Sequence, residues 1–349
     1  MRTKIWSVDK NVDNQDSYQQ IAQAAHFLQE NEVIAFPTET VYGLGGNAKS
    51  DEAVSKIFKA KGRPSDNPLI IHIANKEQLR NFVEEVPEKA EILMDRFWPG
   101  PLTIIFKKKS GVLSEKATAG LSTVAVRMPD HPVALSLIEQ SGLPIAAPSA
   151  NRSGKPSPTT AGHVFEDLDG RIPGIVDGGS TGVGVESTVI DCTEEIPVIL
   201  RPGGITEEQL ESVVGEIKVD PALKDEQKAP KAPGMKYQHY APNAPLYLVH
   251  GSHEFIQKLV DEKRKQGQKV GVLTTEEHQQ DYDADYVFPC GYRTNLDTVA
   301  NLLYKALRSF NNSNVDVIFS EMFPQEGVGH AIMNRLMKAA GGKIIEEID

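Results

Sequence analysis

The sequence predicts an α/β protein in two parts, a larger one built on a twisted mixed sheet and a smaller doubly wound one. Its 349 residues exceed the usual length of a single domain. Apolar runs of strand length alternate with stretches of helical spacing, which is typical of α/β proteins. A stretch at 228–245 with four prolines and no acid separates the two parts.

The elements of the first part do not follow a strict strand–helix–strand rhythm, which favours a mixed sheet. A strand that begins at Val33 gives way at Pro37 to a hydroxyl-rich loop, in which Gly43, Gly45 and Gly46 predict a turn whose amides approach a ligand. Helices are predicted over 16–30, 51–61, 76–97, 131–142 and 206–214, and further strands within 69–74, 98–109, 122–129, 143–151, 174–179, 187–193 and 197–203.

The second part has the pattern of a small Rossmann-like unit. Strands are predicted at 245–251, 269–275, 285–290 and 315–322, with helices at 253–267 and 295–309 and a glycine-led helix at the end. It contains no GxGxxG, so no dinucleotide site is expected there. We therefore predict a catalytic domain over 1–215, a linker over 216–244 and a C-terminal domain over 245–349.

The composition excludes several classes of protein. A net charge of −11 argues against a dedicated nucleic-acid or membrane-surface protein, which needs an overall basic face. The two cysteines, Cys192 and Cys290, form no CxxC pair, so we expect neither disulfides nor a metal site. The first residues lack an apolar signal core and no apolar run is long enough to span a bilayer, so we expect a cytoplasmic protein without membrane contact.

A basic cluster precedes the strand predicted at 69–74. Lys56, Lys59, Lys61 and Arg63 fall within eight positions that contain no acid. For Lys56 and Lys59, a solvated helix face explains the charge as well as a binding site does. Lys61 and Arg63 stand at the end of the helix, where loops of α/β sheets often bind ligands, and together they suit a polyphosphate. The chain has no GxxxxGK[ST], so this is not an ordinary P-loop.

Two further polar residues lie inside apolar strands. Arg127 needs an anionic partner or water, and a ligand carboxylate would serve. A lone histidine such as His72 is more often a satisfied core residue than a ligand. A second polar loop, PSANRSGKPSP at 148–158, offers hydroxyls and amides to a small ligand. Its Ser149, Asn151 and Ser157 also suit simple turns, and the same alternative holds for Thr40, Ser187 and Arg201.

Covalent catalysis by a protein nucleophile is not indicated. The chain has no GxSxG, no HExxH and no cysteine with a matching histidine. The residues singled out above instead suit positioning and charge stabilisation, which phosphoryl and nucleotidyl transfer require.

These segments resemble the two-domain threonylcarbamoyl-AMP synthases, whose first domain is YrdC-like. The resemblance rests on FPTETVYGLG, KAKGRPSDNPLIIHI, FWPGPLT, TVAVRMPDHP, PIAAPSANRSGKPSPT, GVESTVID, LRPG and APGMKYQHYAP, which cover nearly the whole chain. It implies an enzyme that joins L-threonine, bicarbonate and ATP into threonylcarbamoyl-AMP and releases pyrophosphate, with Mg²⁺ accompanying the ATP. It also implies that the product passes to the tRNA threonylcarbamoyl transferase machinery, for modification of adenosine 37.

The resemblance also implies roles for individual residues. A catalytic tetrad would consist of Lys61, Arg63, Ser149 and Asn151. Threonine would contact Thr40, His72, Arg127, Ala147 and Ser187. ATP would contact Arg63, Asn67, Thr123, Ser149, Ser157, Arg201 and Tyr240. Because Tyr240 lies in the linker, the resemblance implies that this segment folds over the first domain as a lid that excludes water.

Two other functions are compatible with these sequence features. A concave basic surface could bind double-stranded RNA without catalysis, and a weak RNA contact is compatible with either view. Carbamoyl transfer, as in hydrogenase maturation factors, is the second alternative, although the zinc-type cysteine clusters and acylphosphatase module of those proteins are not visible in this sequence.

Overall fold

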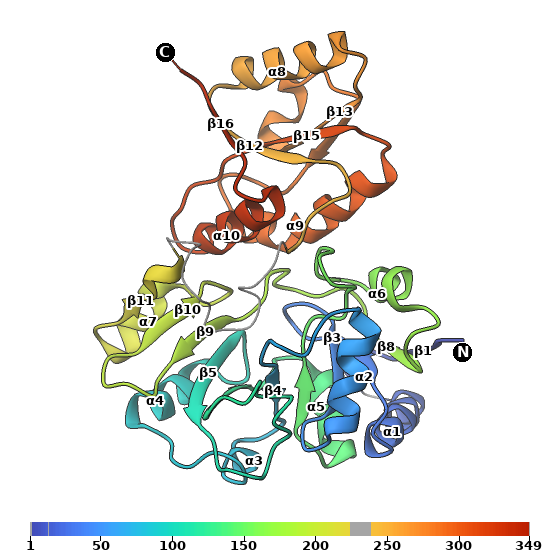
Figure 1. Cartoon of the computed structure of the whole chain (residues 1–349), viewed down its shortest axis with the longest axis vertical. Helices are drawn as coiled ribbons and strands as arrows, with labels where there is room; N and C mark the ends of the chain where they lie inside the picture. The colour runs from blue at the N-terminus through green and yellow to red at the C-terminus, as the bar shows by residue number, and fades with distance from the viewer. Residues whose placement is uncertain (1, 13, 224–238, 349) are drawn as a thin grey trace. The chain divides into compact units, whose positions relative to one another are not determined.

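The computed structural model describes residues 2–12, 14–223 and 239–348 (Figure 1). These residues form two compact units. The first holds the described residues up to Leu223, except 154–156 and 183–185, and the second holds those two short segments together with 239–348. Both units are α/β, which confirms the predicted fold class. The linker predicted at 216–244 lies partly outside the described residues, and the domain boundaries stay predictions.

The first unit is built on a mixed sheet of eleven strands in the described chain. Their order is β1-β8-β2-β3-β7-β4-β6-β5-β9-β10-β11. The strands are β1 (Lys4–Ser7), β2 (Ile34–Phe36), β3 (Gly43–Asn47), β4 (Ile70–His72), β5 (Leu102–Lys107), β6 (Thr123–Arg127), β7 (Ile145–Ala147), β8 (Gly174–Asp177), β9 (Thr188–Asp191), β10 (Val198–Arg201) and β11 (Lys218–Val219).

Helices of the first unit pack into two separate apolar cores. Leu28 of α1 and Leu137 of α5 share one core with Phe36 and Ile145 of the sheet. The other core contains residues of α2, α4, α6 and α7 and includes Ile71. The helices are α1 (Gln15–Gln29), α2 (Asp51–Lys61), α3 (Lys76–Leu79), α4 (Glu88–Phe97), α5 (Pro132–Ser141), α6 (Ala161–Leu168) and α7 (Glu207–Val214), followed by the 3-10 turn η1 (Pro221–Leu223).

Strand register places the polar residues of interest on one face of this sheet. His72 pairs with Arg127 of β6 on one side and with Ile145 of β7 on the other. Paired residues point to the same side of a sheet and neighbours along a strand alternate. His72 and Arg127 therefore share the face of Ile145, whereas Ile71 packs into the core on the opposite face. The sheet thus gathers residues far apart in sequence on one surface.

The glycine-rich turn predicted after Pro37 is wrong, because Gly43–Asn47 forms strand β3 between β2 and β7. A Cβ atom on Gly45 would lie 2.6 Å from Ile145 Cγ2 and 2.7 Å from Phe36 Cε1. Close packing on the sheet therefore explains the glycine at this position, without any turn.

The prediction of one continuous helix over 76–97 is also wrong, since α3 ends at Leu79 and α4 begins at Glu88. Val83 between them makes an isolated antiparallel bridge to Lys108. Pro87 is the N-cap of α4, and its ring disfavours helical geometry in the residue before it.

The second unit has a five-stranded parallel sheet in the order β14-β13-β15-β12-β16. In Figure 1, α8 lies on one face of this sheet and α9 and α10 lie on the other. The strands are β12 (Leu246–His250), β13 (Val270–Thr274), β14 (Tyr286–Pro289), β15 (Val317–Glu321) and β16 (Ile344–Glu346). The helices are α8 (His253–Lys265), α9 (Leu296–Ser309) and α10 (Gly329–Ala340), with 3-10 turns η2 (Glu276–Asp281) and η3 (Phe310–Asn312). The Rossmann-like architecture expected for this part is confirmed.

Candidate active site

Lys61 joins the end of α2 to the polar loop that follows β7. Gly62, with φ at 68°, ends the helix in the left-handed conformation. Lys61 is 2% exposed, and its Nζ donates to Ser149 O, to Asn151 O at 2.7 Å and to Asn151 Oδ1 at 3.4 Å. Ser149 Oγ donates to the same Asn151 Oδ1 at 2.5 Å. Three members of the predicted tetrad are therefore in direct contact.

Arg63, the fourth member, follows Gly62 in the same segment. Its guanidinium lies over the Phe58 ring, 5.4 Å from the ring centroid. Asn67, four residues further on, is 2% exposed, and its Nδ2 has no hydrogen-bond partner among the described residues. A buried amide donor without a partner is costly, which is expected where a ligand supplies the acceptor.

A second cluster surrounds Arg127, which is 3% exposed at the end of β6. Its Nη1 donates to Thr40 Oγ1 at 2.9 Å, and its Nη2 forms an ion pair with Glu39. Two buried atoms of this cluster, Arg127 Nε and Glu39 Oε2, have no hydrogen-bond partner among the described residues. The Arg127 cluster thus contains one buried donor and one buried acceptor that have no partner among the described residues.

His72 is held as a neutral imidazole beside this cluster. It is 4% exposed, its Nδ1 lies 3.1 Å from Ile70 O, and its ring meets the Phe36 ring edge-on. Burial, together with the positive charge of Arg127, lowers the pKa of His72 to about 3. The side chain is uncharged at neutral pH and can serve as a polar contact.

The late strands hold a third group of polar residues. Arg201 Nη2 donates to Ser187 O at 2.8 Å, and Ser187 Oγ lies 2.7 Å from Thr103 Oγ1. Ser157, fully buried, donates from Oγ to Glu186 Oε1 at 2.7 Å. Arg201, the last residue of β10, and Ser187, which directly precedes β9, are therefore brought together.

Ala147 and Thr123 are placed by the strands themselves. Ala147 ends β7, pairs with Ile70 and is 3% exposed. Thr123 begins β6, four residues before Arg127 on the same face of the sheet.

Tyr240 belongs to the second unit. Its ring centroid lies 5.1 Å from that of Tyr304 and 5.6 Å from that of His239, and its φ of 64° is unusual for a residue other than glycine. Its predicted contact with ATP, and the lid, stay predictions.

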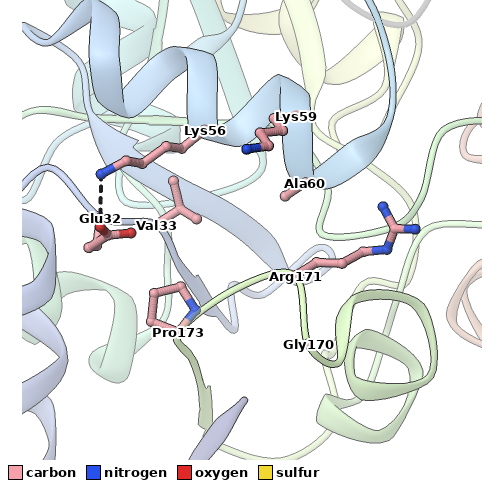
Figure 2. Close-up of a pocket in the computed structure, with 8 residues that line it drawn as sticks. All are labelled: Glu32, Val33, Lys56, Lys59, Ala60, Gly170, Arg171 and Pro173. Carbon is pink, nitrogen blue, oxygen red and sulfur yellow. Dashed lines mark hydrogen bonds and ion pairs between the residues drawn. The ribbon is translucent and has the colours of Figure 1, made fainter. Parts of the chain in front are cut away.

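The other lysines of the basic cluster face a separate hollow of about 390 Å³ on the first unit, shown in Figure 2. Lys56 forms ion pairs with Glu32 and Glu52, each at 2.8 Å, and Figure 2 shows its side chain reaching toward Glu32. Lys59 is exposed and also lines this hollow. Because its charge is neutralised, Lys56 is better explained as part of a solvated helix face than as a phosphate ligand.

Sequence reasoning missed Glu39, whose carboxylate contacts Arg127 within the Arg127 cluster. An acid between two threonines, in a segment whose neighbours are nearly all apolar, was a usable signal. Only the fold, however, brings this carboxylate to a residue 88 positions away.

Two families match the chain. One, described as "Telomere recombination", matches residues 26–203, and the other, "Threonylcarbamoyl-AMP synthase, C-terminal domain", matches residues 205–341. The threonylcarbamoyl-AMP synthase of Bacillus subtilis is 63% identical over 345 residues, which cover 99% of this chain and 100% of that protein. The protein of the same name from Pyrococcus abyssi is 53% identical and covers 93% of this chain and 94% of its own length.

Solved structures agree with this relationship. The structure of Pyrococcus abyssi Sua5 complexed with L-threonine is 51% identical, with a TM-score of 0.92, and covers 99% of this chain and 100% of that one. The structure of Escherichia coli YciO, at 24% identity and a TM-score of 0.52, covers 58% of this chain and 96% of that one and shows a shared fold alone. In the described part of the chain, no helix is long and apolar enough to cross a membrane. The chain belongs to the two-domain threonylcarbamoyl-AMP synthases.

Proposed function

We propose that the chain joins L-threonine, bicarbonate and ATP into threonylcarbamoyl-AMP with release of pyrophosphate, the activity that names its family. The product would supply the transferase machinery that forms N6-threonylcarbamoyladenosine at position 37 of tRNA. The single observation that carries the substrate assignment is the pair of unpartnered buried atoms, Arg127 Nε and Glu39 Oε2.

These two atoms are complementary to an α-amino acid. The open Arg127 Nε–H can donate to a carboxylate, and the hydrogen bond from Nη1 to Thr40 fixes the guanidinium plane. Glu39 Oε2 can accept from the amino group. A zwitterion could satisfy both atoms at once, whereas a simple anion would leave Glu39 Oε2 without a donor. Thr40, His72, Ala147 and Ser187 complete the proposed threonine-binding residues.

The reaction proposed here requires no protein nucleophile. The threonine amine takes up carbon dioxide derived from bicarbonate and loses a proton, which gives a carbamate. A carbamate oxygen then forms a bond to the α-phosphorus of ATP while the bond to the pyrophosphate oxygen breaks. Glu39 would still accept from the carbamate N–H, so the amino group stays oriented through both steps.

Charge stabilisation is assigned to the tetrad of Lys61, Arg63, Ser149 and Asn151. Arg63 would bind two phosphate oxygens, and Lys61 would hold the Ser149–Asn151 loop in place while adding its positive charge. Asn67 supports an ATP contact through its unpartnered amide donor. Arg63, Asn67, Thr123, Ser149, Ser157, Arg201 and Tyr240 are the proposed ATP-contacting residues.

Mg²⁺ would enter with ATP and would be bound mainly by the phosphate oxygens, where it offsets their negative charge. In the described residues of the first unit, no three His, Cys, Asp or Glu side chains gather closely enough to form a dedicated metal site.

The test is to incubate the full-length protein with ATP, bicarbonate and labelled threonine and to measure pyrophosphate and the threonine-dependent adenylate. Both should form, and both should require bicarbonate. If neither forms while the protein binds double-stranded RNA tightly, the synthase assignment fails in favour of RNA binding. If carbamoyl phosphate replaces bicarbonate and threonine, carbamoyl transfer is the function instead.

A further inference from the structure

The carboxyl ends of the parallel strands in the second unit carry a cluster of polar side chains that the proposed reaction does not use. The chain leaves β13 toward β14 on one side of the sheet and leaves β15 through α10 toward β16 on the other side. Ligands of open α/β sheets bind where neighbouring strands diverge in this way. Thr274 and Glu321, the last residues of β13 and β15, mark this position.

Three potential metal ligands converge beside this position. His253 begins α8, and His278 and Asp281 belong to η2. His278 Nδ1 lies 2.9 Å from Asp281 Oδ2, and His253 Nδ1 lies 3.3 Å from the same oxygen. One ligand atom from each of the three side chains lies within 4.8 Å of the others.

We propose that His253, His278 and Asp281 form a binding site for one divalent transition-metal ion of the zinc class. Bond lengths of about 2.1 Å in a tetrahedral zinc site place the ligand atoms roughly 3.4 Å apart. The two His–Asp separations of 2.9 and 3.3 Å are close to that spacing, and the two histidine ligand atoms lie within 4.8 Å of each other. Two imidazoles and one carboxylate favour zinc over magnesium or calcium and leave a fourth position for water or a substrate.

A buried polar network stands directly behind one of the ligands. His253 Nε2, the nitrogen turned away from Asp281, lies 3.9 Å from Glu321 Oε1. Glu321 is 4% exposed and is fixed by Tyr282 OH at 2.9 Å, Arg293 Nη1 at 3.3 Å and Thr274 Oγ1. Metal-bound histidines commonly direct their second nitrogen toward a carboxylate, which fixes the tautomer and the ring orientation.

The exposure of the cluster allows an ion to enter from solvent. The His253, His278 and Asp281 side chains are 35%, 28% and 43% exposed, so solvent reaches all three. The alternative without a metal ion is a pair of surface His–Asp ion pairs, which would contribute little stability. That alternative does not require both Nδ1 atoms to meet on one carboxylate oxygen.

The experiment uses full-length protein without an affinity tag, stripped of metal by a chelator that is then removed, and without ATP. Zn²⁺ is titrated in competition with a chromophoric chelator. Wild type should bind one Zn²⁺ per chain, and His278→Ala and Asp281→Asn should each weaken binding by more than about 100-fold, the upper effect of losing an outer partner. His330→Ala, an exposed histidine of the same unit, is the matched control and should bind like wild type.

The proposal is overturned if wild type binds Zn²⁺ no more tightly than Asp281→Asn, or if His330→Ala loses as much affinity as His278→Ala. Asp281→Asn keeps the shape of an exposed side chain, so it reports on binding even if His278→Ala does not fold. Either outcome leaves the proposed synthase function untouched, because no residue of the metal cluster belongs to the threonine or ATP assignment.

Discussion

Replacing Lys61 by methionine tests whether this lysine anchors the polar loop as well as supplying charge. Methionine keeps an unbranched apolar side chain but removes the ammonium that donates to Ser149 O, Asn151 O and Asn151 Oδ1. A hydrogen bond from a charged group contributes about 1.5–3 kcal/mol, and the acceptors left behind are partly buried. Because the three bonds share one ammonium they are not additive, and we expect a loss of about 3 kcal/mol in the free energy of unfolding.

Tryptophan fluorescence during urea unfolding measures this loss of stability in the first unit, which contains Lys61. The chain has two tryptophans, Trp6 and Trp98, and both are buried in the first unit. At about 2–4 °C per kcal/mol for a unit of this size, the melting temperature should fall by roughly 6–12 °C.

Lys59→Met is the matched control, because Lys59 is exposed on the same helix, and its unfolding free energy should change by less than about 0.5 kcal/mol. The reasoning is refuted if Lys61→Met and Lys59→Met unfold at the same urea concentration. Lys61 would then act through its charge alone.

Three further predictions concern the rest of the site. Arg63→Ala should abolish pyrophosphate release while the far-ultraviolet circular dichroism spectrum stays unchanged, because this side chain is only partly buried; a variant with wild-type turnover would remove Arg63 from the tetrad. His72→Gln should flatten the dependence of stability on pH. In the folded protein the pKa of His72 is lowered from 6.5 to about 3. Between these two pH values the unfolded chain therefore binds one more proton than the folded chain. The free energy of unfolding thus falls by up to about 1.4 kcal/mol for each unit by which the pH is lowered. An unchanged pH profile of urea unfolding would contradict this assignment. Deleting residues 228–349 should impair adenylate synthesis if the linker acts as a lid, and a truncated protein that folds with full activity would show that the lid is dispensable.

The fold class could be predicted because alternating helices and strands leave a periodic apolar pattern in the sequence. Individual elements could not be predicted where distant contacts decide them. β1 pairs with β8, some 170 positions away, and nothing local identifies it as a strand. The glycines of β3 resemble a ligand-binding turn until Phe36 and Ile145 are seen to fill the space beside them.

The candidate site could be predicted only where the type of a residue and its neighbours in the sequence already indicate a function. Lys61 and Arg63 could be identified from their charge, and Arg127 from its position inside an apolar strand. Residues that depend on a partner supplied by the fold leave a weaker signal, as Glu39 does beside Arg127. The cluster of His253, His278 and Asp281 gave no signal in the sequence. The two histidines are 25 positions apart, and the absence of cysteine pairs argued against a metal site.

The most direct test of the central claim is calorimetric titration of three ligands into wild type, Arg127→Gln and Glu39→Gln. The ligands are L-threonine, L-threoninol, which lacks the carboxylate, and 3-hydroxybutyrate, which lacks the amino group. Wild type should bind threonine roughly 10- to 100-fold more tightly than either analogue, the effect of one charged hydrogen bond. Arg127→Gln should no longer distinguish threonine from threoninol, and Glu39→Gln should no longer distinguish threonine from 3-hydroxybutyrate. A folded Arg127→Gln variant that still prefers threonine over threoninol as strongly as wild type does would contradict the proposed substrate site.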